Sequence, residues 1–395
     1  MSIKSTALIL LVGFGLFSNA ETLKEKAKAP ETKTSMAEFL DQFMALKKYL
    51  ISDEEFQDSK NSEDISMHLN DLVKAVKKTA HDPQLNQENF KFSRQTLEDH
   101  VTETERVFRL GNKAYARWMT NSTLGICMSC HTQMPTSGRN FSVFMKSDYI
   151  TSEFDRAEFM FATKNFEGAS QMYQKLISDY PKSNLSPDRL EKSVRRELAY
   201  QIRIKRDFNA ANSLVESFKK NKDLPLFLKT NLKEWGEQLT QWKNKKLPVA
   251  SEVSSEQLAK FAKQSLSVDL NKVRIGDADS NLIADLVVSS LLYEYLQKHP
   301  SFESPDILYW LAVVDRELDR SAFYSLADLY LKECILKFPG TLMAGKCYKE
   351  YEKEMVLGYT GSAGTNVPIE VIQDLKFLKS FIESKGKVPL KIRKP

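Results

Sequence analysis

The residues best suited to chemistry lie together in the segment Cys127-Met128-Ser129-Cys130-His131. Two thiols three residues apart can each add to a vinyl group of haem, and the imidazole that follows directly can coordinate the haem iron. On a helix or helical turn the two thiols lie roughly on one face. We therefore expect one covalent haem c, with Cys127 and Cys130 as thioether positions and His131 as the proximal axial ligand.

A disulfide, a zinc half-site and a redox pair are the other uses of two thiols at this spacing. Zinc requires a second pair of ligands, and the remaining cysteines, Cys334 and Cys347, lie far along the chain without metal-like spacing. A redox pair does not require a histidine at position 131. Because the chain has only four cysteines and five histidines, their meeting in this order favours haem attachment.

The N-terminus has the three parts of a secretory signal peptide. A basic start, Met1–Lys4, precedes an apolar run from Ala7 to Phe17 and the small residues of Ser18–Ala20. We expect residues 1–20 to be removed after Ala20 and the mature protein to be soluble and periplasmic; the alternative is an uncleaved membrane anchor. No later stretch approaches the roughly twenty apolar residues of a spanning helix. Export agrees with the haem motif, since families with this motif attach haem in the periplasm.

Composition indicates an all-α protein. Of the 395 residues, 42% are hydrophobic, only 14 are glycine and 13 are proline, and strand-like alternation is absent from the sequence. The net charge of +5 and the mixing of lysines with acids along helical stretches do not favour a nucleic-acid partner. Residues 21–35 are polar and predict a flexible tether, and the remaining length suffices for two or three domains.

Apolar periodicity predicts four helices in residues 36–145. The first follows Ser35 as N-cap, and the second follows Ser62 and ends before His81. The third runs from about Ser93 to Met119 and buries a face that includes Leu110, Tyr115 and Trp118. The fourth is short: it begins near Ser122, carries the motif and stops near Pro135 because proline cannot donate to a helix. Four helices with short connections predict an up-and-down bundle.

This arrangement resembles the class II cytochromes c, the cytochrome c′ and c-556 group. In that family a four-helix bundle carries the haem motif on its last helix, which matches the position of Cys127, Cys130 and His131. The short fourth helix departs from the family pattern. The resemblance implies that the sixth iron ligand comes from the first helix. Members with methionine there are low-spin electron carriers, whereas an apolar residue leaves the iron open to small gases.

Met44 is the expected sixth ligand because it lies well inside the amphipathic first helix, and Met36 is the second choice. Met134, His68, His100 and the absence of a ligand remain alternatives, and a methionine on an apolar helix face often serves only as packing. Met134 lies three residues after His131 and is poorly placed for the opposite haem face. The four histidines outside the motif lie in polar surroundings, where we expect them to be exposed: His68, His81, His100 and His299.

Residues 146–395 resemble a tetratricopeptide-like array of helix pairs. Three segments show its small and aromatic residues at helical spacing, and Pro181 and Pro339 close two of them. Residues 247–298 fit poorly, apart from one helix through Leu282–Leu292. Such arrays usually bind another protein on a concave surface; the alternative is that they only support the haem bundle. The segment Gly358–Asn366 lacks the ending of a phosphate-binding loop and predicts a surface loop.

Cys334 and Cys347 flank a turn expected at Pro339-Gly340. An antiparallel helical hairpin would bring them together, and an oxidising compartment would let them form a disulfide. The alternative is two buried free thiols that act as small hydrophobic groups.

These features predict an exported monohaem electron carrier that docks to a protein redox partner through its helical repeats. The alternative is a haem protein with an open sixth position that binds or senses a small gas. Catalysis, such as a peroxidase or nitrogen-oxide reductase activity, is not expected, because only one haem motif occurs and no catalytic triad or carboxylate pair stands out.

Overall fold

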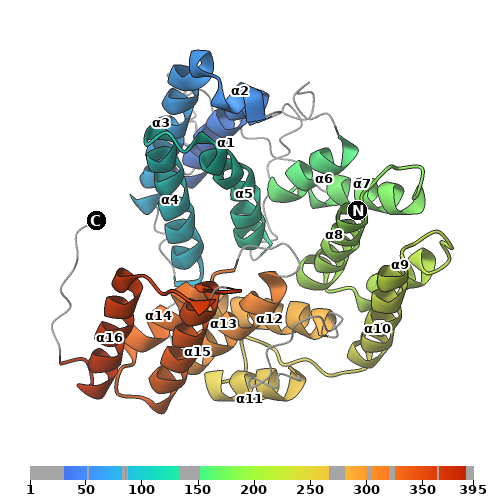
Figure 1. Cartoon of the computed structure of the whole chain (residues 1–395). Helices are drawn as coiled ribbons and strands as arrows, with labels where there is room; N and C mark the ends of the chain where they lie inside the picture. The colour runs from blue at the N-terminus through green and yellow to red at the C-terminus, as the bar shows by residue number, and fades with distance from the viewer. Residues whose placement is uncertain are drawn as a thin grey trace, which may run out of the picture.

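The computed structural model describes residues 31–50, 53–81, 85, 88–132, 152–266, 281–299, 304–319, 325–362 and 364–387 (Figure 1). In this part of the chain there are sixteen α-helices and one two-stranded ribbon, which confirms the all-α class. The predicted signal peptide with its cleavage point at Ala20, residues 21–30 of the tether, and Met134 lie outside the described residues.

The first group of helices forms one end of the molecule, drawn blue to teal in Figure 1. It comprises α1 (Glu31–Leu50), α2 (Asp53–Gln57), η1 (Ser59–Asn61), α3 (Ser62–Lys78), η2 (Thr79–His81), α4 (Glu88–Arg109) and α5 (Lys113–His131). Helix α1 packs on α3, α3 on α4, and α4 on α5. These helices bury a common apolar core that includes Phe43, Leu46, Ile65, Leu69 and Val101.

Ion pairs fix the direction of the first two long helices. Lys78 at the end of α3 binds Glu38 near the start of α1 at 2.5 Å, and Lys48 near the end of α1 binds Asp64 near the start of α3 at 3.2 Å. The two helices are therefore antiparallel. The short connections to α4 and α5 repeat the reversal, so the start of α1 and the end of α5 lie at the same end of this group.

The structure corrects the predicted boundary between the third and fourth helices. Instead of one helix from Ser93 to Met119, the chain turns at Gly111, whose φ of 90° suits a residue without a Cβ. Asn112 then caps α5, because its side chain accepts a hydrogen bond from the backbone N–H of Tyr115 at 3.4 Å. The fourth helix is consequently not short: α5 has 19 residues.

This break also changes which side chains are buried. Leu110, Tyr115 and Trp118, predicted on the buried face of one long helix, are 65%, 46% and 61% exposed. The turn at Gly111 resets the helical phase, so the spacing counted across it loses its meaning. At the N-terminal side, α1 begins at Glu31 rather than after Ser35, so residues 31–35 of the predicted tether are helical.

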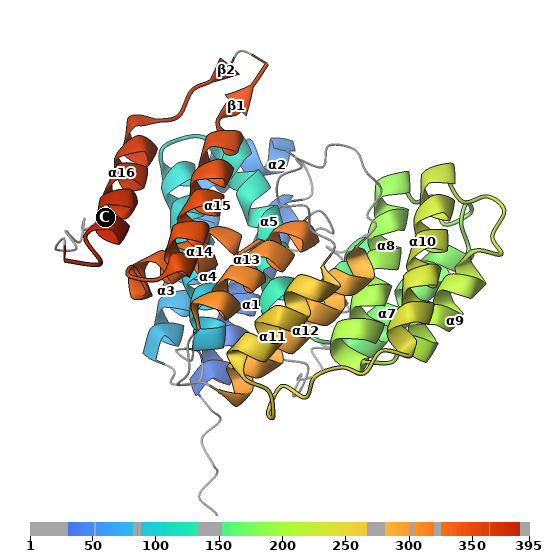
Figure 2. The same ribbon diagram turned by 90° about the horizontal axis from the view of Figure 1, so that it is seen from below.

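The second group of helices follows in chain order, and most of them pack against their sequence neighbours (Figure 2). It comprises α6 (Glu153–Ala162), α7 (Phe166–Ser178), α8 (Pro187–Ala199), a π-helical turn η4 (Tyr200–Lys205), α9 (Phe208–Phe218), α10 (Leu226–Lys243), α11 (Ser255–Ser265), α12 (Leu282–Lys298), α13 (Pro305–Asp319), α14 (Ala327–Lys337), α15 (Leu342–Gly358) and α16 (Ile369–Glu383).

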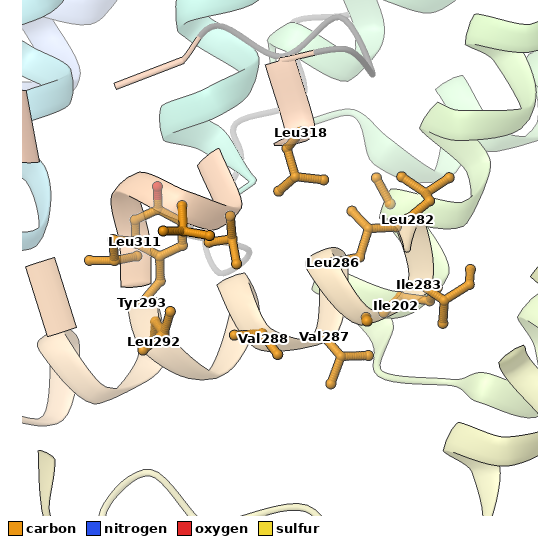
Figure 3. Packing of buried hydrophobic residues seen from close by; sticks show 14 of the residues in the cluster. Ile202, Leu282, Ile283, Leu286, Val287, Val288, Leu292, Tyr293, Leu311 and Leu318 are labelled. Atoms are coloured by element: carbon orange, nitrogen blue, oxygen red, sulfur yellow. The ribbon is translucent and has the colours of Figure 1, made fainter. Parts of the chain in front are cut away.

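Helix α12 packs against helices of both groups. It is apolar around its whole circumference, and such a helix is buried on all sides. Figure 3 shows its side chains between Ile202 of η4 and Leu311 of α13. Helix α12 also contacts α4. The two groups of helices therefore share an interface rather than only a connecting segment.

The Gly/Ser/Thr-rich segment predicted as a surface loop is a small exposed hairpin. Strand β1 (Thr360–Gly361) pairs antiparallel with β2 (Gly364–Thr365), and Thr360 lies opposite Thr365. Figure 2 shows this ribbon projecting from the end of α15.

Cys334 of α14 and Cys347 of α15 lie on the two arms of an antiparallel hairpin, whose helices end at Lys337 and resume at Leu342. A disulfide joins Cys334 and Cys347, and their Cα atoms are 6.3 Å apart. That distance lies in the range usual for disulfides.

Replacing Cys334 and Cys347 with alanine is expected to lower the free energy of unfolding by about 3 kcal/mol, because the loop that the disulfide closes is no longer constrained in the unfolded chain. Urea denaturation of the two proteins under non-reducing conditions measures the difference. Mass spectrometry of the unreduced, alkylated wild type checks the premise: two alkylated thiols at these positions would contradict it, whereas a cross-linked peptide pair is the expected product.

Candidate functional site

The segment Cys127–His131, the predicted haem motif, occupies the last turns of α5. In Figure 1 this helix lies between α4 and α6, above the orange helices α12 and α13. Ile126 packs into the core of the first group, whereas Met128 belongs to the core of the second group, against which Cys127 also packs. Cys127, Cys130 and His131 are each half-buried. The motif therefore lies at the boundary between the two groups of helices.

His131 is held by a backbone carbonyl of the second group. Its Nδ1 makes a hydrogen bond with the carbonyl oxygen of Ala162, the last residue of α6. Because a carbonyl only accepts, Nδ1 carries the proton and Nε2 keeps its lone pair. Burial, together with the charge of Lys164, lowers the pKa of His131 to about 4. The imidazole is therefore neutral at neutral pH, as a metal ligand must be.

The carbonyl of Ala162 is available because α6 ends there. The last four carbonyls of a helix have no partner within it. The following turn satisfies the other three through backbone N–H groups, namely Thr163 to Phe159 at 3.0 Å, Asn165 to Met160 at 2.8 Å and Lys164 to Phe161 at 3.2 Å. His131 supplies the donor for the fourth. The ring of His131 therefore satisfies the last carbonyl of α6, and that carbonyl orients the ring.

The two thiols of the motif are reduced and uncharged. Burial, and next to it the charge of Cys130, raises the pKa of Cys127 to about 12. Burial also raises the pKa of Cys130, although the charge of Lys164 and the nearby hydroxyl of Ser93 oppose it. Both thiols and the imidazole of His131 lie within the last turns of α5.

Three segments that are distant in the sequence meet at Cys130. Ser93 comes from the start of α4, Lys164 from the turn between α6 and α7, and Tyr330 from α14. Burial raises the pKa of Tyr330 most, and the charge of Cys130 raises it further. An ion pair of 3.5 Å between Lys91 of α4 and Glu333 of α14 joins the same two helices. Sequence reasoning missed these residues because no local pattern predicts which helix ends converge.

Met44 faces the same helix as His131. It is 8% exposed and packs against Phe159 and Leu40 in a small cluster separate from the core of the first group. Phe159 lies one turn before Ala162 on α6, so Met44 and His131 approach neighbouring turns of one helix. Met36 lies about two turns earlier on α1 and is half-buried. Nothing in these contacts brings Met44 or Met36 to a measured position opposite Nε2, and sixth ligation stays a prediction.

The histidines weighed as sixth ligands have other partners. His100 Nε2 lies 2.8 Å from the carbonyl oxygen of Met119, which is about 18 Å from His131 along α5 at the usual rise per residue. His68 Nδ1 lies 2.8 Å from Gln42 Oε1 on α1.

Of the four histidines expected to be exposed, only His81 is; His68 and His299 are half-buried. The expectation was wrong for His100, which is 8% exposed because its bond to α5 satisfies it inside the helix group.

Helix α6 covers one side of the first group. Along their described lengths, α1 and α5 do not pack side by side as the pairs α1/α3, α3/α4 and α4/α5 do. Contacts from both run to α6 instead: α5 packs on it, Met44 of α1 touches Phe159, and the charge of Asp155 acts on Lys47. The side on which Met44 and His131 lie is therefore formed by α1, α5 and α6 together.

A buried ionic network holds α6 in place. Glu158 accepts a hydrogen bond from Arg196 Nε of α8 at 3.0 Å, and Lys192 Nζ lies 2.9 Å from its other oxygen. Tyr173 of α7 also donates to it. Burial alone would raise the pKa of Glu158, but the charges of Arg196 and Lys192 and these hydrogen bonds outweigh it and lower the pKa to about 2.

Glu158→Gln is expected to lower the free energy of unfolding by about 3 to 5 kcal/mol, because it leaves the buried guanidinium of Arg196 without its counter-charge. The wild-type contribution is fully present above pH 4.5, the ordinary pKa of Glu158, and is lost as the pH falls from 4.5 toward 2. Urea denaturation at several pH values measures both effects. Glu153→Gln, which breaks only an exposed pair with Lys175, is the control; equal losses from both variants would contradict the prediction.

Within the described residues, no group of three or more His, Cys, Asp and Glu side chains is placed to hold a metal ion, and no helix is both long and apolar enough to cross a membrane. No protein-family model, no curated protein and no solved structure matches the chain.

Proposed function

We propose that this protein is an exported monohaem c-type cytochrome that carries single electrons. The observation that carries the proposal is the hydrogen bond from His131 Nδ1 to the carbonyl of Ala162, because it fixes the tautomer in which Nε2 can bind iron. The neutral, half-buried thiols of Cys127 and Cys130 on the same turn of α5 support it.

Bound haem supplies an iron that cycles between the ferric and ferrous states. Cys127 and Cys130 would hold the haem through thioethers, and His131 would ligate its iron. The carbonyl of Ala162 keeps the ring of His131 from rotating. The apolar side chains of Met128, Phe159 and Met44 limit access of water to this side, which lowers the local dielectric and so affects the potential.

Sixth ligation by Met44 is part of the proposal, with Met36 as the second choice. Methionine opposite histidine gives a closed, low-spin iron suited to electron transfer. Support comes from the location of Met44: it is buried, apart from the core of the first group, and one turn of α6 away from the partner of His131. An open iron would instead make the protein a binder or sensor of small gases.

We infer that the chain has two domains that share this function. Helices α1, α3, α4 and α5 are proposed to be a bundle similar to the class II cytochromes c, and the helices from α6 onward a tetratricopeptide-like array. The packing of most helices against their neighbours in the sequence supports both assignments. A redox partner is proposed to dock on the array, in the periplasm, after removal of residues 1–20.

An optical spectrum of the purified protein tests the function. After reduction, the sharp bands of a low-spin c-type haem are expected, and addition of carbon monoxide should leave them unchanged. Bands that shift with carbon monoxide would support gas binding, and the absence of haem bands would reject both functions.

A further inference from the structure

Lys164 occupies a backbone position that usually belongs to glycine. The backbone N–H groups of Lys164 and Asn165 close α6 by bonding to the carbonyls of Phe161 and Met160, and Lys164 has a φ of 64°. This is the left-handed residue of a Schellman motif, where glycine is favoured because it has no Cβ. A lysine here costs free energy relative to glycine, so its side chain is a candidate for a compensating role.

The charge of Lys164 has no carboxylate partner within the described residues. Its side chain is half-buried, and burial lowers its pKa while the only opposing effect is the charge of Cys130. Three other half-buried lysines do have a carboxylate partner, namely Lys91 with Glu333, Lys192 with Glu158 and Lys332 with Asp374. Cys130 is an uncharged thiol and would become an uncharged thioether on haem attachment, so in neither form does it compensate the ammonium group of Lys164.

The same turn serves His131 in two ways. Ala162 presents the carbonyl that accepts from Nδ1, and two residues later Lys164 places a cation close enough to act on both His131 and Cys130. The cation is therefore on the side of the proximal ligand. It comes from the second group of helices, outside the segment that carries the haem motif.

We propose that Lys164 raises the reduction potential of the haem by holding an uncompensated positive charge beside its proximal ligand; this inference rests on the proposed haem function. Ferric haem carries one more positive charge than ferrous haem, so a nearby cation disfavours the ferric form. In a half-buried site the interaction is only partly screened by water and salt. The array of helices thus takes part in tuning the haem.

Potentiometric titration of the haem-loaded protein tests this role. Lys164→Gly and Lys164→Asn both remove the charge and both accept a left-handed backbone. Each is expected to lower the midpoint potential by about 59 mV, which corresponds to a tenfold change in the ferric/ferrous equilibrium of a one-electron couple. Lys164→Arg keeps the charge and should keep the potential within a small fraction of that shift.

Lys385→Gly is the matched control, because Lys385 is also a lysine with positive φ, 53°, but is exposed after α16. It should leave the potential unchanged, and neither glycine variant should melt below the wild type. A Lys164→Gly protein that stains for covalent haem and keeps the wild-type potential would overturn the role of Lys164 while leaving the cytochrome function intact. A wild type without covalent haem would overturn both.

Discussion

Replacing Cys127 and Cys130 with alanine is expected to abolish covalent haem: a denaturing gel stained for haem peroxidase activity should show a band for the wild type and none for the double variant. Each of the two thioether bonds requires one cysteine sulfur, so the double variant can form neither. Haem held only by His131 dissociates when the chain unfolds. The loss should be complete rather than partial, because the remaining two cysteines are bonded to each other and offer no free thiol.

The double variant Cys334→Ala/Cys347→Ala is the control for this experiment. It removes the same number of cysteines but none from α5, so its haem band should match the wild type for equal amounts of protein. Staining that persisted without Cys127 and Cys130 would contradict the proposed attachment site.

Met44→Leu is expected to convert a low-spin ferric spectrum to a high-spin one and to let carbon monoxide bind the reduced iron. Leucine fills nearly the same volume as methionine, so the packing against Phe159 is kept at a cost below about 1.5 kcal/mol. Met44→Ala would open a cavity as well. The leucine variant therefore removes the sulfur with little change in the fold, and ferric absorption spectra report the outcome.

Met36→Leu is the matched comparison on the same helix. An unchanged spectrum for Met44→Leu together with a high-spin spectrum for Met36→Leu would assign the sixth ligand to Met36. A wild type that is already high-spin would leave no place for either methionine and would support the gas-binding function.

Several features were predictable from sequence because each depends on local chemistry. The helical character follows from apolar spacing and from the scarcity of glycine and proline, and the hairpin of α14 and α15 follows from Pro339-Gly340 between two apolar runs. The spacing of Cys127, Cys130 and His131 is likewise a property of one helical turn. Such signals need no knowledge of the tertiary fold.

Other features were hidden because they depend on one residue or on distant contacts. Gly111 and Asn112 divide a long apolar pattern, and reading across them misplaced the end of the third helix and the exposed side chains of Tyr115 and Trp118. The carbonyl of Ala162 belongs to the backbone and has no sequence signature as a partner of His131. Its role is recognisable only once α6 is seen beside α5.

The position of Lys164 illustrates the same limit. A lysine after an amphipathic helix is usually an exposed charge, and its left-handed φ and its closeness to Cys130 follow only from the packed structure. Before folding, nothing separates it from Lys385, which shares its backbone conformation but lies far along the chain from the motif.

Tandem mass spectrometry of the peptide that contains Cys127–His131, taken from the denatured wild type after production in a host that exports it and attaches haem to proteins, tests the central claim most directly. The expected peptide carries one haem bound through both Cys127 and Cys130. Two free thiols in this peptide, open to alkylation and without haem, would contradict it.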